Sequence, residues 1–197
     1  MLLRSLIVNI SQKFPWLIDT FSLEPQQIIS HDRMILEQVI LPSFVSTITI
    51  QKVLFVGCAA YTQQYKEIFR EKEYWTIDPK RVKKKYGSER HIVDSIAKIE
   101  RYITKNYFDV IIMNGVIGFG LNRIGDIERA INACYATLAS QGILLVGWND
   151  TARRIPIDIR AIHALGSFRQ YYFEPLQACH YRTEGSQRHT LSFYQKA

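Results

Sequence analysis

The sequence predicts an α/β protein with a mostly parallel β-sheet covered by helices. Its 197 residues are 47% hydrophobic and 22% charged, which is ordinary for one globular domain with a core. From residue 52 onward, short apolar runs alternate with segments of helical periodicity. This alternation is typical of βαβ units, so we expect residues 51–197 to form the domain that contains the sheet.

Residues 1–50 are predicted to be a helical extension of the same domain. Five apolar residues share one face of a first helix: Leu3, Leu6, Ile7, Ile10 and Phe14. In the simpler interpretation this face docks on the core; the alternative is an interfacial helix, or one that forms a homodimer. A second helix is expected from Glu24 to Leu41, ending at Pro42.

Five strands are predicted from residue 52 onward. Their ranges are 52–57, 73–78, 90–94, 107–114 and 142–148. The last two are apolar on both faces, as central strands of a parallel sheet are. Two further runs, 167–175 and 189–195, have strand-like aromatic and alternating residues, so five βα units are followed by two terminal strands.

Helices are expected between these strands. One begins at Ser95, a good N-cap, and has Ile96, Ile99 and Ile103 on one face. Another ends near Gly142, and Pro156 is expected to open a last helix. The helix before Gly142 has Asp126 and Glu128 in its first turn and an apolar stripe of Ile124, Ile127, Ile131, Cys134 and Leu138.

The residues that follow the strands are the candidate ligand-binding residues, because ligands of open α/β sheets bind outside the carboxyl ends of the strands. Asp78 follows Gly57 by 21 residues, the spacing at which a carboxylate accepts hydrogen bonds from the two hydroxyls of a ribose. Asp94 and Ser95 are placed to meet an adenine. The complete candidate set is Gly57, Cys58, Ala59, Asp78, Pro79, Asp94, Ser95, Asn114 and Gly115.

The single glycine after the first strand indicates a ligand without phosphates. A pyrophosphate requires close approach of the backbone and an open helix N-terminus, for which several glycines are needed. Gly57 allows the backbone to approach a nucleoside, and Cys58 and Ala59 are small enough to leave room.

Five segments resemble, in order and spacing, the motifs of class I S-adenosylmethionine-dependent methyltransferases. They are VLFVGCAAYT, WTIDP, HIVDS, FDVIIMNG and LASQGILLVGW, and the resemblance covers about residues 50–195. It implies a Rossmann-like three-layer sandwich whose seven-stranded sheet is mostly parallel, with the last strand antiparallel between the fifth and sixth. It also implies S-adenosyl-L-methionine as the cofactor.

The resemblance assigns a role to each candidate residue. Gly57 faces the methionine part of the cofactor, and Asp78 holds the ribose hydroxyls. Asp94 with Ser95 borders the adenine, and Asn114 with Gly115 faces the sulfonium and the substrate. Asn114 is not followed by the Pro-Pro-aromatic tripeptide of amino-directed nucleic-acid methyltransferases, which argues against that subclass.

No general base can be identified from the sequence. His31, Tyr61 and Asn114 are the weak catalytic candidates, because the segment before the first strand and the first βα turn border the pocket in this fold. Methyl transfer needs positioning above all, and a base only where the acceptor begins protonated and weakly acidic. No residues with metal-ligand spacing are present, so no metal is expected.

The expected function is methyl transfer to a small-molecule acceptor such as a sugar or other metabolite. Two alternatives stay open. Ala59 and Tyr61 stand where the family commonly has glycines, which fits a non-catalytic partner or scaffold protein with weak or no cofactor binding. The net charge of +7 is the only support for an RNA- or nucleotide-directed enzyme, because the basic cluster at 80–85 is typical of a solvated helix face.

The compartment is expected to be the cytoplasm. The N-terminal apolar stretch is broken by polar residues and has no cleavage pattern, so we expect neither a secretory signal nor a transmembrane segment. Cys58, Cys134 and Cys179 are odd in number and lack paired spacing, which is typical of a reducing compartment.

Overall fold

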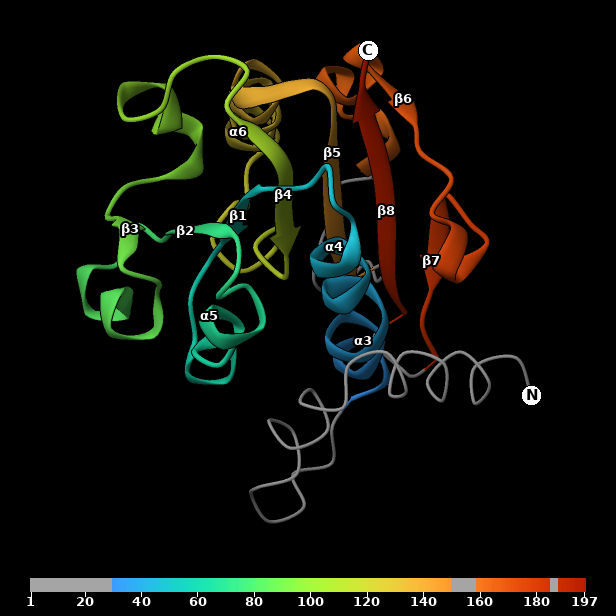
Figure 1. Ribbon diagram of the computed structural model, residues 1–197. Helices are drawn as coiled ribbons and strands as arrows, with labels where there is room; N and C mark the ends of the chain where they lie inside the picture. The colour runs from blue at the N-terminus through green and yellow to red at the C-terminus, as the bar shows by residue number, and fades with distance from the viewer. Residues whose placement is uncertain (1–29, 150–158, 185–187) are drawn as a thin grey trace.

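A mixed eight-stranded sheet forms the centre of the computed structural model, which describes residues 30–149, 159–184 and 188–197. The strand order is β3-β2-β1-β4-β5-β8-β6, and β7 also pairs with β8. Figure 1 shows this order from β3 on one side of the sheet to β6 and β7 on the other. The predicted α/β class with a mostly parallel sheet is confirmed.

The first five strands are parallel to one another. They are β1 (Lys52–Val56), β2 (Glu73–Ile77), β3 (Arg90–Ile92), β4 (Phe108–Asn114) and β5 (Leu138–Asn149). Because β1 lies between β2 and β4, the chain reverses its direction across the sheet after β3, and the carboxyl ends of β1 and β4 lie side by side. In open α/β sheets this switch point is where ligands bind.

The terminal strands form the antiparallel part of the sheet. β8 (His189–Lys196) lies antiparallel between β5 and β6 (Phe168–Gln170), as predicted. The predicted strand 167–175 is too long, because the chain leaves the sheet after β6, forms the short helix η7 (Glu174–Leu176) and returns as β7 (His180–Arg182). β6 and β7 pair with successive parts of β8, so together they occupy the place of one edge strand.

The N-terminal helical segment does not end at Pro42, so that prediction is wrong. It continues as α3 (His31–Ile35), the π-helix η1 (Leu36–Ile40) and α4 (Leu41–Ser46). Pro42 lies in the first turn of α4, directly after the π-helix. An N–H in the first turn of an α-helix has no partner within that helix, so proline is tolerated there.

The other connections are short helices except for α6 (Ile124–Thr137). After β1 the chain forms η2 (Ala60–Thr62) and α5 (Tyr65–Ile68), two short helices between strands where helices are expected. The helix predicted at Ser95 is the 3₁₀-helix η4 (Ile96–Arg101), whose Ala97 N–H donates to the Ser95 hydroxyl. The remaining 3₁₀-helices of the described residues are η3 (Arg81–Tyr86), η5 (Ile159–Ala161) and η6 (His163–Ser167).

The predicted apolar stripe of α6 is wrong at both ends. Ile124 is 49% exposed, and Leu138 belongs to β5 rather than to the helix. Gly142 does not stop α6, which ends at Thr137; it lies within β5 where the backbone of β4 comes close. Ile127, Ile131 and Cys134 are buried as predicted.

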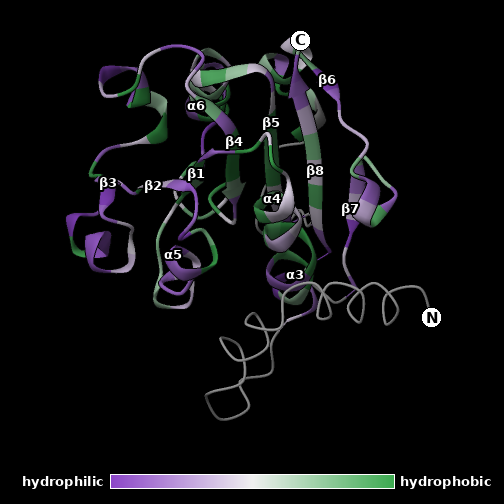
Figure 2. Ribbon diagram, viewed as in Figure 1, coloured by the Kyte–Doolittle hydropathy of each residue, from purple (hydrophilic) through white to green (hydrophobic). Residues whose placement is uncertain are grey.

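Two apolar clusters cover the two faces of the sheet and make a three-layer structure. One cluster joins β4 and β5 to α6, η4 and η6. The other joins the opposite faces of β1, β4, β5 and β8 to α3, η1, α4 and α5. Figure 2 shows hydrophobic residues concentrated in the central strands and hydrophilic residues around β3.

Several predictions fall outside the described residues. They are the first helix with its homodimer interface, the start of the second helix at residues 24–29, and the helix opened by Pro156. The boundary between an extension at 1–50 and a domain at 51–197 remains a prediction, although α3, η1 and α4 pack into the core of the sheet. No helix in the described part of the chain is long and apolar enough to cross a membrane.

Candidate functional site

The turn after β1 brings the backbone close to the carboxyl end of β4. Gly57 has a φ of +86°, a conformation that glycine adopts at little cost. Its N–H donates to the Ile77 carbonyl oxygen at 2.8 Å, which ties the turn to β2. A Cβ at this position would lie 2.8 Å from Cγ1 of Val116, so the loop after β4 packs directly against the glycine.

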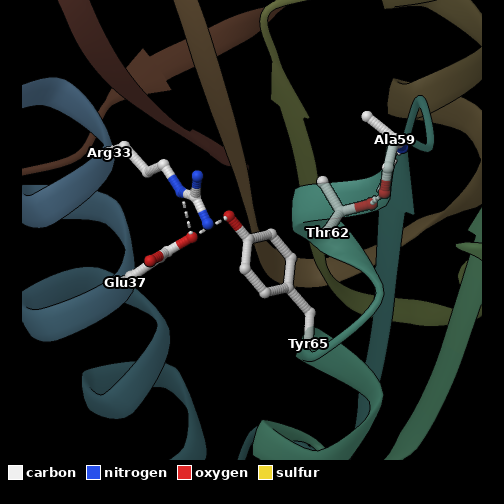
Figure 3. A network of polar contacts seen from close by, with 5 residues as sticks. All are labelled: Arg33, Glu37, Ala59, Thr62 and Tyr65. Carbon is white, nitrogen blue, oxygen red and sulfur yellow. Dashed lines mark hydrogen bonds and ion pairs between the residues drawn. The ribbon is translucent and has the colours of Figure 1, made fainter. Parts of the chain in front are cut away.

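The amide groups of this turn all donate within the protein. Besides Gly57 N–H, Cys58 N–H donates to Oδ2 of Asp78 at 2.9 Å, and Ala59 N–H donates to the Thr62 hydroxyl at 3.0 Å. The Thr62 hydroxyl in turn donates to the Ala59 carbonyl oxygen, so one side chain closes the turn (Figure 3). The turn thus presents none of these three N–H groups to a phosphate.

Asp78 retains capacity to accept further hydrogen bonds. The carboxylate is 8% exposed, and besides the bond from Cys58, its Oδ1 accepts from the Lys80 N–H at 2.8 Å. An ionised carboxylate has about four acceptor positions. Each oxygen therefore has one position left for an outside donor, and the two together match the pair of hydroxyls on a ribose.

A pocket of about 370 Å³ opens beside this carboxylate, a volume within the usual range for small-molecule sites. Eight of the nine candidate binding residues line it: Gly57, Cys58, Ala59, Asp78, Pro79, Ser95, Asn114 and Gly115. The sequence did not single out its apolar wall, which includes Val56, Ile77, Ile96, Val116, Phe119 and Leu121. Lys80 and Lys83 also line it, so the basic cluster borders the pocket with part of its length.

Asp94 does not line the pocket. Its Oδ1 accepts from the Ser95 N–H at 2.7 Å, its Oδ2 accepts from the Tyr102 hydroxyl at 3.0 Å, and Lys98 forms an ion pair with it. The hydrogen bond from the Ser95 backbone lowers the pKa of this carboxyl most; desolvation opposes it, and the contacts with Tyr102 and Lys98 lower the pKa further. The carboxylate thus supports the start of η4, and Ser95 and Ile96 border the pocket.

His31 is also outside the pocket. Its Nδ1 accepts from the Glu184 N–H at 2.9 Å, which joins the start of α3 to the segment after β7. The hydrogen-bond partner of His31 is therefore a residue that does not line the pocket.

Tyr61 lines the pocket and is 48% exposed. The guanidinium carbon of Arg33 lies 5.0 Å from the centre of its ring, a cation–π contact with α3. Desolvation raises the pKa of the Tyr61 phenol, partly opposed by Arg33. At neutral pH the phenol is protonated, so it can donate a hydrogen bond to a ligand but cannot begin as a base.

A buried carboxylate joins α3 and η1 to the first βα unit. Glu37 is 1% exposed, and one of its oxygens accepts from Arg33 Nε at 2.7 Å and from the Tyr65 hydroxyl at 2.8 Å (Figure 3). Desolvation, together with Glu37, raises the pKa of the Tyr65 phenol above its usual value. These contacts fix α3 beside Tyr61 and the pocket mouth.

Asn114, at the end of β4, contacts a histidine that the sequence analysis did not select. Its carboxamide oxygen lies 2.9 Å from Nε2 of His189, whose Nδ1 lies 2.7 Å from the carboxamide oxygen of Asn149. His189 is 6% exposed, and burial lowers the pKa of its imidazole. The three residues are far apart in the sequence, so only the pairing of β8 with β5 reveals the contact.

The fold is similar to that of solved methyltransferases. The N-methyltransferase NodS from Bradyrhizobium japonicum WM9, in complex with S-adenosyl-L-homocysteine, is 16% identical with a TM-score of 0.62, over 98% of this chain and 97% of that one. A TehB-like S-adenosylmethionine-dependent methyltransferase from Corynebacterium glutamicum is 15% identical with a TM-score of 0.59, over 97% and 98%.

A third structure is the 1,6-didemethyltoxoflavin-N1-methyltransferase from Burkholderia thailandensis with bound substrate and S-adenosylhomocysteine. It is 10% identical with a TM-score of 0.56, over 80% of this chain and 76% of that one. No protein-family model and no curated protein sequence matches the chain. At these identities the similarity establishes the fold, which is that of class I S-adenosylmethionine-dependent methyltransferases.

Proposed function

We propose that this chain is an S-adenosylmethionine-dependent methyltransferase that acts on a small-molecule acceptor. The Asp78 carboxylate carries the proposal: it lines a pocket and has two acceptor positions free beside a turn whose amides are occupied. This arrangement suits a ribose without phosphates. The fold shared with solved methyltransferases supports the same function.

The cofactor would extend along the carboxyl ends of four strands. Asp78 and Pro79 would hold the ribose, and Ser95 with Ile96 would border the adenine. The turn of Gly57, Cys58 and Ala59 would lie along the methionine part, with Asn114 and Gly115 at the sulfonium. The predicted role of Asp94 is then indirect, because its carboxylate accepts the Ser95 N–H and so positions a residue of the adenine wall.

The protein would act mainly by alignment and by excluding water. The bound cofactor supplies an activated methyl group, so the chain has to bring the acceptor atom into line with it. Val116, Phe119 and Leu121 form an apolar rim on the loop after β4, next to Asn114. An apolar rim displaces water from the bond that breaks, and the Asn114 carboxamide can orient a polar acceptor.

The acceptor is proposed to be small because, of the three neighbouring structures described above, the one whose name gives a substrate has a small molecule, 1,6-didemethyltoxoflavin, bound. The pocket volume of about 370 Å³ fits a small ligand. None of the described contacts favours one acceptor atom over another.

Calorimetric titration of the full chain with S-adenosylhomocysteine and S-adenosylmethionine tests the proposal. We expect micromolar binding to the wild type. Asp78→Ala removes the acceptor of both ribose hydroxyls, and hydrogen bonds to charged groups contribute about 1.5–3 kcal/mol each, so the Kd should rise at least tenfold. Binding that is unchanged in Asp78→Ala would refute the site.

Asp109→Ala is the matched control. Oδ2 of Asp109 accepts two backbone N–H groups, from Gln51 at 2.7 Å and Lys52 at 2.8 Å, near the opposite ends of the strands. The two variants thus lose comparable backbone contacts, but only Asp78→Ala removes a carboxylate from the pocket at the carboxyl ends of the strands. We expect Asp109→Ala to keep the wild-type Kd. No heat with the wild type would support a scaffold protein instead, and salt-dependent retention on heparin or RNA would support a nucleic-acid-directed protein.

A further inference from the structure

The carboxamide of Asn114 occupies space that a side chain on the neighbouring strand would fill. Asn114 in β4 is the register partner of Gly147 in β5. A Cβ on Gly147 would lie 1.8 Å from Oδ1 of Asn114 and 2.9 Å from Nε2 of His189. The absence of a side chain at Gly147 therefore lets the carboxamide lie across β5 and reach β8.

The ring of His189 is held by contacts at both of its nitrogens, and its backbone by further hydrogen bonds. Its two ring nitrogens contact the carboxamides of Asn114 and Asn149, at 2.9 Å and 2.7 Å. Its carbonyl oxygen accepts from both the N–H and the hydroxyl of Thr183, at 2.8 Å and 3.0 Å. Asn149 is its register partner in β5, so the sheet itself aligns the ring with the amide.

The protonation state of His189 restricts how the two carboxamides are turned. A neutral imidazole has one donor and one acceptor nitrogen. Burial lowers the pKa of His189, and the charged group that acts against this among the described residues is Asp32 of α3. With a neutral ring between them, one carboxamide must present its oxygen and the other its NH₂ group. Rotation of a carboxamide by half a turn exchanges these two groups.

We propose that His189 is a positioning residue for Asn114: its Nδ1–H donates to the Asn149 oxygen, and its Nε2 accepts from the Asn114 NH₂ group. The 2.7 Å contact with the Asn149 oxygen is then the N–H···O bond. At the 2.9 Å contact, where the Asn114 oxygen is placed, the carboxamide is rotated by half a turn so that its NH₂ group faces Nε2. Asn114 consequently turns its carbonyl oxygen toward the pocket, where it can accept a hydrogen bond from an N–H or O–H of the methyl acceptor. The catalytic meaning of this orientation rests on the proposed function.

The proton position can be read directly by NMR. The full chain is labelled with ¹⁵N-histidine, and long-range ¹H–¹⁵N spectra are recorded at pH 7, where protonated and bare ring nitrogens are well separated. The signals of His189 are identified by their loss in His189→Gln, among the five histidines of the chain. We expect a neutral ring with its proton on Nδ1. A proton on Nε2, or on both nitrogens, would overturn the proposal.

The same spectra of three variants test the contacts of His189 with Asn149 and Asn114. Asn149→Leu removes the acceptor at Nδ1, so the proton should move to Nε2 and the Asn114 oxygen should then receive it; an unchanged tautomer contradicts the assignment. Gly147→Ala should displace the carboxamide and change the His189 signals. Gly166→Ala is the control, because a Cβ there meets no atom within 4 Å.

These outcomes are independent of cofactor binding. If S-adenosylhomocysteine fails to bind the wild type, the proposed function fails while the tautomer result still decides the contact. If S-adenosylhomocysteine binds and the tautomer is wrong, only the positioning role of His189 is lost.

Discussion

Glu37 is a carboxylate that is almost completely buried. A carboxylate that is 1% exposed is stable in a folded protein only when its oxygens have donors. Arg33 and Tyr65 supply two such donors from opposite sides, one from α3 and one from α5. The three side chains therefore connect the N-terminal helical segment to the first βα unit, beside the pocket.

Tyr65→Phe should destabilise the protein. The variant keeps the ring, whose packing against Phe55 is edge-to-face at 5.2 Å, and removes only the hydroxyl. Glu37 then loses one donor while it remains buried, which costs about 1–3 kcal/mol. Urea denaturation followed by circular dichroism measures the loss in the free energy of unfolding.

Tyr102→Phe is the matched control. Its hydroxyl also donates to a carboxylate, that of Asp94, but the ring is 52% exposed. Water replaces a lost partner at an exposed site, so this variant should keep nearly the wild-type stability. Equal destabilisation by the two substitutions would show that the burial of Glu37 does not decide the effect.

The sequence predicts those residues of the candidate site that directly follow a strand. Asp78 and Gly57 were found from their spacing, since each directly follows an apolar run that forms a strand. His189 could not be found in this way, because it begins the last strand and meets Asn114 only through the antiparallel insertion of β8. Glu37 was missed because helix periodicity does not reveal that a polar residue faces a buried phenol.

At the scale of elements, the irregular start of β5 explains why the prediction that Gly142 ends a helix is wrong. Leu138 pairs with Phe108 and Ile143 pairs with Val110, so β5 has extra residues opposite β4. Gln141 in this irregular stretch has a φ of +65°. Gly142 lies where the two backbones approach, although in the sequence it looks like a helix stop.

Gly142→Ala should therefore destabilise the protein. The added Cβ would lie 2.9 Å from the Ala139 carbonyl oxygen and 3.1 Å from the Phe108 carbonyl oxygen, and backbone atoms yield poorly. Strain of this kind costs about 1–3 kcal/mol. Differential scanning calorimetry should show a lower Tm, while Gly166→Ala, whose Cβ meets open space, should leave the Tm within a degree or so of the wild type. An unchanged Tm in Gly142→Ala would contradict the close approach.

The sequence predicts that helices lie between the strands, but it does not predict their type or their length. Ser95 caps a helix as expected, but the helix is a short 3₁₀ segment that ends at Arg101 after two turns. Pro42 was expected to end a helix, since the sequence gives no sign of the π-helix that places this proline in a first turn. Local pattern thus indicates a helix, and packing decides where it ends.

At the scale of the whole molecule, the two ends of the sheet differ in what they contain. The carboxyl ends of the parallel strands carry Asp78 and Asn114, which line a pocket of about 370 Å³, and His189 contacts Asn114 there. A larger cleft of about 550 Å³ lies at the other end, lined by Asp109, Gln141 and Gly142 among others. Volume does not select the functional site; the chemistry of the lining groups and the switch point of the strands do.

Binding at the carboxyl ends should stabilise the entire fold. A ligand that binds only the folded state at a concentration of 100 times its Kd adds about 2.7 kcal/mol to the free energy of unfolding. For a chain of this size, that corresponds to a rise in Tm of roughly 5–10 °C. The expected result is that S-adenosylhomocysteine raises the Tm of the wild type, and of Asp109→Ala by a similar amount. Asp78→Ala should show at most about half of this rise, because a Kd that is tenfold higher leaves the ligand at only about ten times Kd, which adds about 1.4 kcal/mol. A rise in Asp78→Ala as large as that of the wild type would place the ligand away from this carboxylate, which also holds the turn after β1 through the Cys58 N–H.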